Sequence, residues 1–191
     1  MLTIVYDSNV LYPSTLRDVL IRLGRKGLVQ PKWTERILDE TFGNLVKNRP
    51  DIDKSRLSRT RELMSAAFLD VVVDEYELWI DQIVLPDEND RHVVAAAIQS
   101  EAKVIVTKNL KDFPEDELGK WDIVVKHPDA FLTEMFVRHP TAVAEIIDEI
   151  ATTWKSLDTT RDDVLASLKI ETPKASKCID EYFRFDPPLS L

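Results

Sequence analysis

The fold is decided near the start of the chain by the stretch LTIVYDSN, residues 2–9. Its first five residues favour a β-strand and show no regular apolar–polar alternation, which is typical of a strand buried on both faces of a sheet. The stretch ends on Asp7, Ser8 and Asn9. A carboxylate is therefore predicted at the carboxyl end of a buried strand, the edge at which α/β sheets bind their ligands.

Strands and helices alternate after this stretch. Apolar residues at helical spacing predict helices that begin after Pro13 and at Thr34, and a polar third helix over residues 51–67. Short strands are expected at residues 71–73, 104–107 and 123–125, a buried helix at 90–98, and further helices at 130–137, 141–157, 161–168 and 175–183. Connections too long for hairpins predict an α/β fold with a mostly parallel sheet covered on both faces.

The charge of the chain is unevenly distributed. A formal charge of −9 argues against a polyanionic ligand, yet the first 62 residues carry 12 Lys and Arg against 8 Asp and Glu, while the rest carry 13 against 26. This asymmetry indicates a basic face on an acidic protein. Its candidate residues are either phosphate contacts or solvated helix surface: Arg17, Arg22, Arg25, Lys26, Lys54, Arg56, Arg59 and Arg61.

The compartment is predicted from what the sequence lacks. There is no basic-then-apolar leader, and no apolar stretch approaches the ~20 residues that span a bilayer. The single cysteine, Cys178, cannot form an internal disulfide and is expected to be a packing residue. We therefore expect a cytoplasmic protein with no membrane association.

Three acidic residues from separate parts of the chain are candidate metal ligands. Asp7 ends the first strand, Glu40 lies beside the apolar stripe of an early helix, and Asp90 opens the buried helix. Each residue alone has an ordinary explanation as a cap or a surface residue. However, a buried carboxylate costs several kcal/mol unless it is paired. Carboxylates that converge at one sheet edge therefore predict a site for Mg²⁺ or Mn²⁺.

Four stretches of the chain resemble the successive motifs of PIN domains, and more narrowly those of the VapC-type toxins of bacterial toxin–antitoxin pairs. They are residues 4–11, 37–40, 86–98 and 104–114, and their order and spacing agree with the family from residue 3 to about residue 131. The resemblance implies a three-layer, PIN-like α/β nuclease domain over residues 1–138. Residues 139–191 are then expected to form a helical extension that serves as a cap, a dimer surface or an antitoxin-docking element.

The resemblance also implies roles for individual residues. It places Asp7, Glu40 and Asp90 around the metal, as Mg²⁺ or Mn²⁺ ligands. Asn109 stands where the family often has a fourth acid, so a second metal should bind more weakly unless Asp112 or Asp87 supplies the missing carboxylate. Either Glu40 or Asp112 is expected to orient or deprotonate the attacking water. The predicted catalytic set is therefore Asp7, Glu40, Asp90, Asn109 and Asp112.

Residues next to the acids are expected to support them or to contact the substrate. The hydroxyls of Ser8 and Thr107 either hold the carboxylates in place or are satisfied by the backbone. Arg91 and Lys108 flank the acids in sequence and are expected to contact RNA, since a cluster of acids repels it. Cations that could follow the RNA backbone further out are Arg17, Lys26, Arg56 and Arg61. The histidines, His92 included, show no metal-ligand spacing and are expected to have surface or structural roles.

The function implied by the resemblance is metal-dependent endoribonuclease activity in the toxin of a toxin–antitoxin pair. The implied substrate is tRNA or ribosomal RNA, cut to leave a 5′-phosphate and a 3′-hydroxyl, and the implied partners are a cognate antitoxin and a second copy of the chain. Two alternatives stay open. Asn109 is compatible with a degenerate RNA- or protein-binding module that cleaves little. A haloacid-dehalogenase-like phosphatase usually shows Asp-x-Asp followed by Gly-Thr, whereas this chain has DSNVL at residues 7–11.

Overall fold

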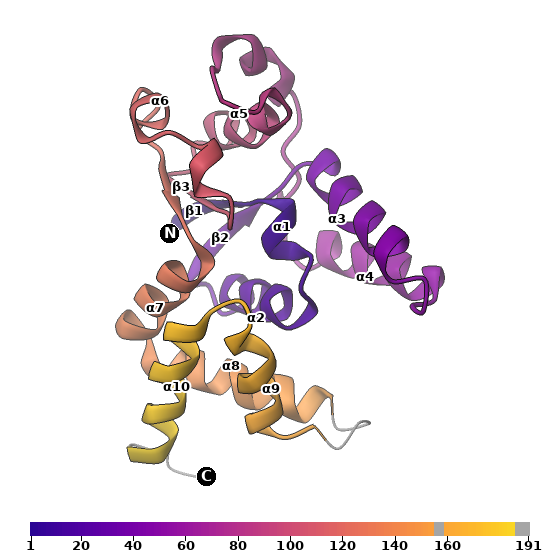
Figure 1. The fold of residues 1–191 in the computed structure, drawn as a ribbon, viewed down its shortest axis with the longest axis vertical. Coiled ribbons are helices and arrows are strands. Elements are labelled where there is room, and N and C mark those ends of the chain that lie inside the picture. Colours follow the sequence, from indigo (N-terminus) through magenta and orange to yellow (C-terminus); the bar gives the residue numbers. More distant parts are fainter. Residues whose placement is uncertain (155–158, 186–191) are drawn as a thin grey trace.

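The computed structural model describes residues 1–154 and 159–185. Figure 1 shows a small sheet with helices on both sides and the C-terminal helices gathered at one end of the molecule. The strands are β1 (Leu2–Tyr6), β2 (Val29–Lys32), β3 (Val104–Val106) and β4 (Val124–Lys126). The α-helices are α1 (Ser8–Leu11), α2 (Ser14–Arg25), α3 (Glu35–Asn48), α4 (Lys54–Ala66), α5 (Arg91–Gln99), α6 (Glu115–Gly119), α7 (Pro128–Arg138), α8 (Pro140–Thr153), α9 (Arg161–Lys169) and α10 (Pro173–Phe185). Short 3₁₀ helices are η1 (Tyr76–Gln82), η2 (Glu88–Asp90) and η3 (Leu110–Asp112).

The four strands pair in parallel in the order β2-β1-β3-β4, which confirms the predicted α/β sheet. Tyr6 at the end of β1 lies opposite Val106 at the end of β3. The pairing continues one step further, because the amide of Asp7 donates to the Val106 carbonyl at 3.1 Å. The residues that follow β1 and β3 therefore emerge side by side at the carboxyl edge of the sheet.

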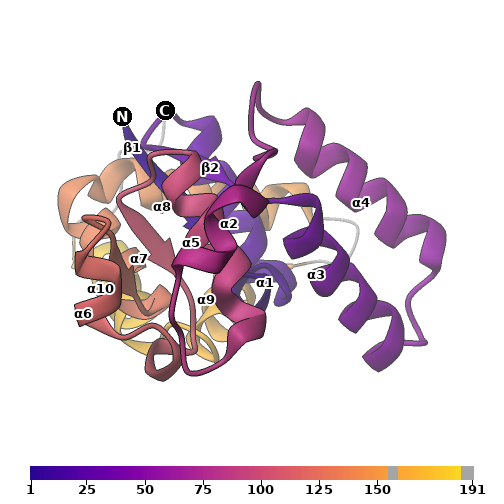
Figure 2. The same cartoon turned by 90° about the horizontal axis from the view of Figure 1, so that it is seen from above.

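Helices cover the sheet in layers. Helix α5 lies on one face, and α2 and α7 lie on the other (Figure 1). Seen from above, α3 and α4 form an arm beside the sheet (Figure 2). Helices α8, α9 and α10 pack against α2, α7 and one another, so they extend the layer on the face opposite α5. This arrangement confirms the predicted α/β fold with a C-terminal helical extension.

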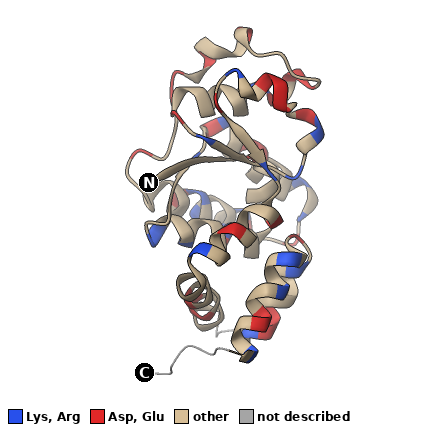
Figure 3. Ribbon diagram, turned by 90° about the vertical axis from the view of Figure 1, so that its left-hand side faces the viewer, with Lys and Arg blue, Asp and Glu red and all other residues tan. Residues whose placement is uncertain are grey.

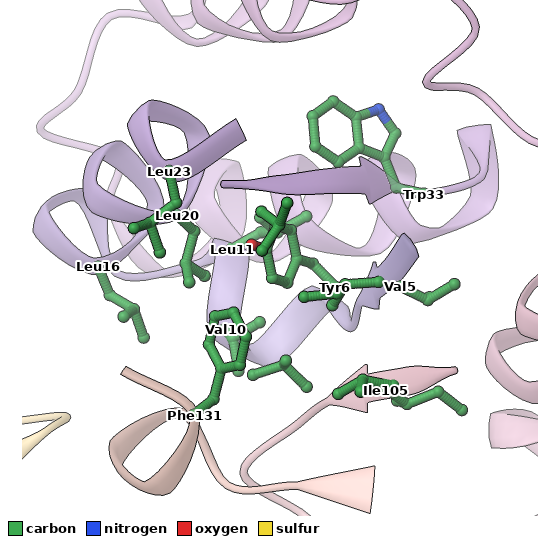
Figure 4. Close-up of a cluster of buried hydrophobic side chains, with 14 of the residues drawn as sticks. Val5, Tyr6, Val10, Leu11, Leu16, Leu20, Leu23, Trp33, Ile105 and Phe131 are labelled. Atoms are coloured by element: carbon green, nitrogen blue, oxygen red, sulfur yellow. The ribbon is translucent and has the colours of Figure 1, made fainter. Parts of the chain in front are cut away.

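The hydrophobic core lies between β1 and the helices α2 and α7. Leu16, Leu20 and Leu23 repeat at helical spacing on α2 and are fully buried, facing the side chains of β1 and α1 (Figure 4). Each such side chain contributes about 1.5–3 kcal/mol when it leaves water. Tyr6 meets Phe131 of α7 edge to face, with ring centroids 6.3 Å apart. This packing holds the carboxyl end of β1 in place.

Two expectations about strands differ from the structure. The edge strand β2 was not predicted, because Pro31 has no backbone N–H and argues against a strand interior. At the edge of the sheet, the N–H that Pro31 lacks would not face a neighbouring strand, so no carbonyl is left without a donor and the strand forms. The predicted strand at 71–73 is wrong, since Val72 makes only an isolated parallel bridge with Trp33.

Two further points concern the helices. The predicted helix 141–157 is observed as α8 and ends at Thr153, and residues 155–157 of that prediction lie outside the described residues. Within residues 1–154 and 159–185, no helix combines the length and the apolar character that crossing a membrane requires.

Candidate functional site

Asp7 accepts four hydrogen bonds in the candidate site. It caps the N-terminus of α1, where its Oδ1 accepts from the Ser8 amide at 2.6 Å and from the Ser8 hydroxyl at 3.3 Å. Its Oδ2 accepts from Thr107 Oγ1 at 2.6 Å and from Asn9 Nδ2 at 2.5 Å. The side chain is nearly buried, with 4% exposed. Burial raises the pKa of Asp7, and the hydrogen bonds from Thr107 and Ser8 oppose that shift.

Asn9 and Thr107 join the two strand ends. Asn9 Nδ2 also donates to Thr107 Oγ1 at 2.9 Å, and Asn9 Oδ1 accepts from the amide of Lys108 at 2.9 Å. The hydroxyl of Thr107 in turn accepts from the amide of Asn109 at 3.1 Å. Side chains thus continue the sheet hydrogen bonding beyond β1 and β3. Both hydroxyls named from the sequence, Ser8 and Thr107, contact Asp7, and their catalytic role stays a prediction.

Glu40 reaches the site from the middle of α3, a helix that Thr34 caps by accepting from the Ile37 amide at 3.1 Å. Its Oε1 lies 3.1 Å from Nε2 of His92 and 3.2 Å from Nε of Arg36. Partial burial acts to raise the pKa of Glu40, but the interactions with His92 and Arg36 outweigh it and lower the pKa below its usual value. Glu40 is therefore held as a carboxylate.

Asp90 stands at the junction between η2 and α5, where its side chain is half-buried. Burial raises the pKa of Asp90, the negative charges of Asp7, Asp87 and Asp112 raise it further, and the result is a pKa of about 6. His92 opposes this rise. Acids from three segments of the chain, which are the end of β1, η2 and η3, therefore share one electrostatic environment at the carboxyl edge of the sheet.

The acids have the chemistry that a hard divalent cation requires, but they do not form a complete coordination site. Carboxylate oxygens are the ligands that Mg²⁺ and Mn²⁺ prefer, and a cation would relieve the mutual repulsion that raises the pKa of Asp90. Within the described parts of the chain, no three or more His, Cys, Asp or Glu residues form a group that could hold a metal ion. The donor set thus fits the metal in kind, and the carboxylates would have to move closer to bind it.

Asn109 and Asp112 interact with each other at the start of the segment after β3. The amide Nδ2 of Asn109 donates to Oδ2 of Asp112. Asp112 is one of the charges that raise the pKa of Asp90, as is Asp87, whose side chain also caps η2 by accepting from the Asn89 amide at 2.9 Å. Both acids named as substitutes for the missing carboxylate therefore lie within electrostatic reach of Asp90.

The two cations predicted beside the acids are each paired with a carboxylate. Arg91 contacts Glu88 at 2.7 Å, and Lys108 contacts Glu171 at 3.1 Å. Glu171 lies between α9 and α10, so the C-terminal extension reaches the rim of the candidate site. Exposed ion pairs of this kind are weak, at about 0–1 kcal/mol, and leave both cations open to exchange for a phosphate.

Three of the residues named for the basic face are engaged in contacts within the protein. Arg17 is only 9% exposed and donates to the carbonyls of Leu11 and Tyr12 at 2.6 and 3.1 Å, so it is a structural residue. Lys26 pairs with Glu145 and Glu149 of α8, and Arg61 with acids of α3. On the side of the molecule that faces the viewer in Figure 3, cations and acids are interspersed along the helices. On α2, acids of the C-terminal helix α8 therefore neutralise part of the basic surface that the sequence predicts.

His92 and Arg36 are the site residues that the sequence reasoning missed. His92 was expected to be structural or exposed, yet it is 1% exposed and contacts Glu40. Arg36 contacts Glu40 and also donates to the Asn89 carbonyl at 3.2 Å. Two signals pointed to them: His92 lies two residues after Asp90 on a helix that is buried all round, and Arg36 lies four residues before Glu40 on the same helix face.

Comparison with known proteins agrees with this geometry. The family model of the PIN domain matches residues 3–111, which include Asp7, Glu40, Asp90 and Asn109. The chain belongs to the PIN-domain family.

The chain is also similar to a protein of Mycobacterium tuberculosis (strain ATCC 25618 / H37Rv) named "Putative ribonuclease VapC50". The two are 33% identical over 102 residues, which cover 53% of this chain and 60% of the relative. The match thus spans about three-fifths of the length of that relative. No solved structure matches the chain.

Proposed function

We propose that this chain is an Mg²⁺- or Mn²⁺-dependent endoribonuclease and the toxin of a toxin–antitoxin pair. The observation that carries the proposal is that Asp7, Asp87 and Asp112 act on a partly buried Asp90, whose pKa is raised to about 6 by burial first and by these charges second. Such a concentration of negative charge is unfavourable in a folded protein unless a cation joins it. The membership of the PIN-domain family and the name of the similar protein support the assignment to nucleases.

The proposed roles follow from the contacts of each acid. Asp7, Asp90 and Glu40 would hold the cation, which supplies an activated water and neutralises charge on the phosphate. Asp7 is held by Ser8, Asn9 and Thr107, so its position does not depend on the ligand. Glu40 is kept ionised by His92 and Arg36, and it or Asp112 would take a proton from the attacking water.

The test is metal-dependent cleavage of structured RNA. Wild-type protein should cut RNA with Mg²⁺ or Mn²⁺ and stop when EDTA is added, and Asp90→Asn should lose at least about a hundredfold in rate, because it removes a charge that faces the phosphate. Asp116→Asn is the matched control, since Asp116 is exposed in the first turn of α6. Equal residual cleavage by wild type and Asp90→Asn would defeat the proposal.

One observation favours the second candidate, a PIN-fold binding module with little catalysis. Asn109 replaces an acid, and its amide donates to Asp112, which engages a carboxylate that a second metal would need. Under this alternative the protein binds RNA but Asp90→Asn changes neither binding nor cleavage. No observation favours the phosphatase alternative.

We also propose the organisation that goes with a toxin. Residues 1–138 would form the nuclease domain and residues 139–191 an element for docking an antitoxin or a second copy of the chain. The break between α7 and α8 at His139 supports this boundary. Size-exclusion chromatography with light scattering would give the oligomeric state, and a predicted homodimer would elute at twice the mass of one chain.

A further inference from the structure

A polar cavity of about 300 Å³ opens directly beside Asp7. It lies between the segment that follows β1 and the C-terminal end of α3, and six residues line it: Ser8, Asn9, Tyr12, Asn44, Asn48 and Lys108. None of these residues carries a negative charge, and Lys108 carries a positive one. The cavity is therefore a place beside the repelling acids where a nucleic acid strand can be accepted.

Asn9 forms the wall between this cavity and the acids. Its Nδ2 donates to Asp7 Oδ2 at 2.5 Å and to Thr107 Oγ1 at 2.9 Å, and its Oδ1 accepts from the Lys108 amide at 2.9 Å. Both the Nδ2 donor and the Oδ1 acceptor of Asn9 are therefore hydrogen-bonded, which fixes the orientation of the side chain. A ligand in the cavity is separated from the Asp7 carboxylate by one side chain, so a strand that occupies the cavity can place its next phosphate at the acids.

Asn44 and Asn48 contribute two side-chain amides of α3 to the lining of the cavity. They lie four residues apart, on one face of the last turns of α3. Both are exposed, and neither side chain hydrogen-bonds to any residue in the described ranges 1–154 and 159–185. Asparagine is also a weak helix former, so helix stability does not account for two of them here. Each amide offers a donor and an acceptor to a ligand.

Tyr12 contributes an aromatic ring to the cavity, and Lys108 contributes a positive charge. Tyr12 is half-buried, and its carbonyl accepts from Arg17 NH1 at 3.1 Å, which anchors the residue after α1. An aromatic ring is the common platform for an unpaired base. Among the residues that the structure describes, the ammonium of Lys108 contacts the partly exposed carboxylate of Glu171, and a phosphate can displace that contact.

We propose that this cavity binds one unpaired base of an RNA strand, the base adjacent to the phosphate at the acids. Asn44 and Asn48 hydrogen-bond its edge, Tyr12 lies against its ring, and Lys108 binds the neighbouring phosphate. The proposal rests on the proposed function, which sets the direction in which the RNA strand runs from the cavity to the acids. The substrate class that it names is RNA that is single-stranded at this site. The volume of this cavity lies at the lower end of the range for ligand sites, which begins at about 300 Å³. A cavity of this size suits a single nucleotide.

The test measures binding without cleavage. Full-length protein carrying Asp90→Asn is titrated into a short, labelled, unpaired RNA, and the dissociation constant is read from fluorescence anisotropy. Adding Asn44→Ala and Asn48→Ala should weaken binding about tenfold, as expected for two lost hydrogen bonds. The matched control is Val46→Ala, which lies between them in sequence but lines a separate hollow between α3 and α4. It should leave the affinity unchanged, and thermal melting checks that every variant is folded.

A scan with single abasic nucleotides then identifies the bound base. At one position of the RNA, removing the base should weaken binding to the parent, the protein that carries Asp90→Asn alone, about tenfold. With this abasic RNA, adding the two alanine substitutions should cause no further loss of affinity. The proposal is overturned if the parent does not bind the RNA, if the alanine substitutions have no effect, or if their effect persists at every abasic position. The proposed function fails by a separate result, the absence of metal-dependent cleavage by the wild type.

Discussion

Nε2 of His92 lies 3.1 Å from Oε1 of Glu40, and this contact joins the first turn of α5 to the middle of α3. It connects the segment that carries Asp90 to the arm of the molecule that carries Glu40. The other ring nitrogen, Nδ1, is buried and has no hydrogen-bond partner among the described residues. The ring is thus placed by packing, and its one polar contact is to an acid of the candidate site.

His92 is expected to position Glu40. His92→Phe should lower the rate of RNA cleavage about tenfold or more with little change in KM, because it removes one of the two contacts that hold the Glu40 carboxylate and leaves the contact with Arg36. His92→Gln keeps a donor and should recover part of the rate. Single-turnover kinetics measure both. If His92→Phe and His92→Gln lose activity equally while both remain folded, the contact to Glu40 has no positioning role.

Thr107 should matter through its hydroxyl, which donates to Asp7 at 2.6 Å. Thr107→Val removes the donor at nearly constant volume and leaves Asp7 less well oriented, so cleavage should fall about tenfold to a hundredfold. The free energy of unfolding should fall by about 1–3 kcal/mol, since a buried acceptor loses a partner. Thr107→Ser retains the hydroxyl and should behave close to wild type in both urea denaturation and cleavage assays.

Glu171 is expected to weaken RNA binding by occupying Lys108. Glu171→Gln removes this competitor, so affinity for RNA should rise about two- to fivefold and should fall more steeply with salt. The control is Glu181→Gln on α10, where the nearest cation, Lys177, lies 3.8 Å away. An unchanged salt dependence for Glu171→Gln would show that Lys108 does not contact phosphate.

Two glycines give opposite expectations for stability. A Cβ at Gly24 would lie 2.8 Å from the Phe68 ring and 2.9 Å from Cδ of Pro31, so Gly24→Ala should destabilise the protein by about 1–2 kcal/mol. A Cβ at Gly43 meets nothing within 4 Å, so Gly43→Ala should stabilise α3 by about 0.5–1 kcal/mol. Denaturant unfolding of both variants measures the difference, and the same sign for both would contradict the predicted close packing of β2 on α2.

Glu117 should contribute to stability in a pH-dependent way. The hydrogen bond from Lys120 lowers the pKa of Glu117, and the Val84 amide, which donates at 3.2 Å, adds to the shift. The ordinary value is about 4.3, so the unfolded chain binds a proton there before the folded protein does. The contribution is therefore present above about pH 4.3 and is lost as pH falls further. Unfolding midpoints measured against pH should fall less steeply below that pH for Glu117→Gln than for wild type.

Much of the sheet could be predicted because it depends on local pattern. Residues 2–6 and 104–106 are short runs of β-prone side chains, and the helices between strands show regular apolar spacing. The edge strand β2 escaped prediction because Pro31 is unfavourable in most strands and acceptable only at an edge. Whether a strand lies at an edge is a property of the whole sheet, and no local pattern encodes it.

By itself the sequence determined the parallel α/β class, the strand-end position of Asp7 and the place of Asp90 at the start of a buried helix, because hydrophobic periodicity and capping act over a few residues. Only the tertiary structure decided which groups surround those acids. The contact of His92 with Glu40 and the pairing of Lys108 with Glu171 join residues 52 and 63 positions apart. The position of Asn44 and Asn48 in the same cavity as Ser8 and Asn9 is a further case. Electrostatic and hydrogen-bond partners are set by distance in space, which the order of residues along a chain does not specify.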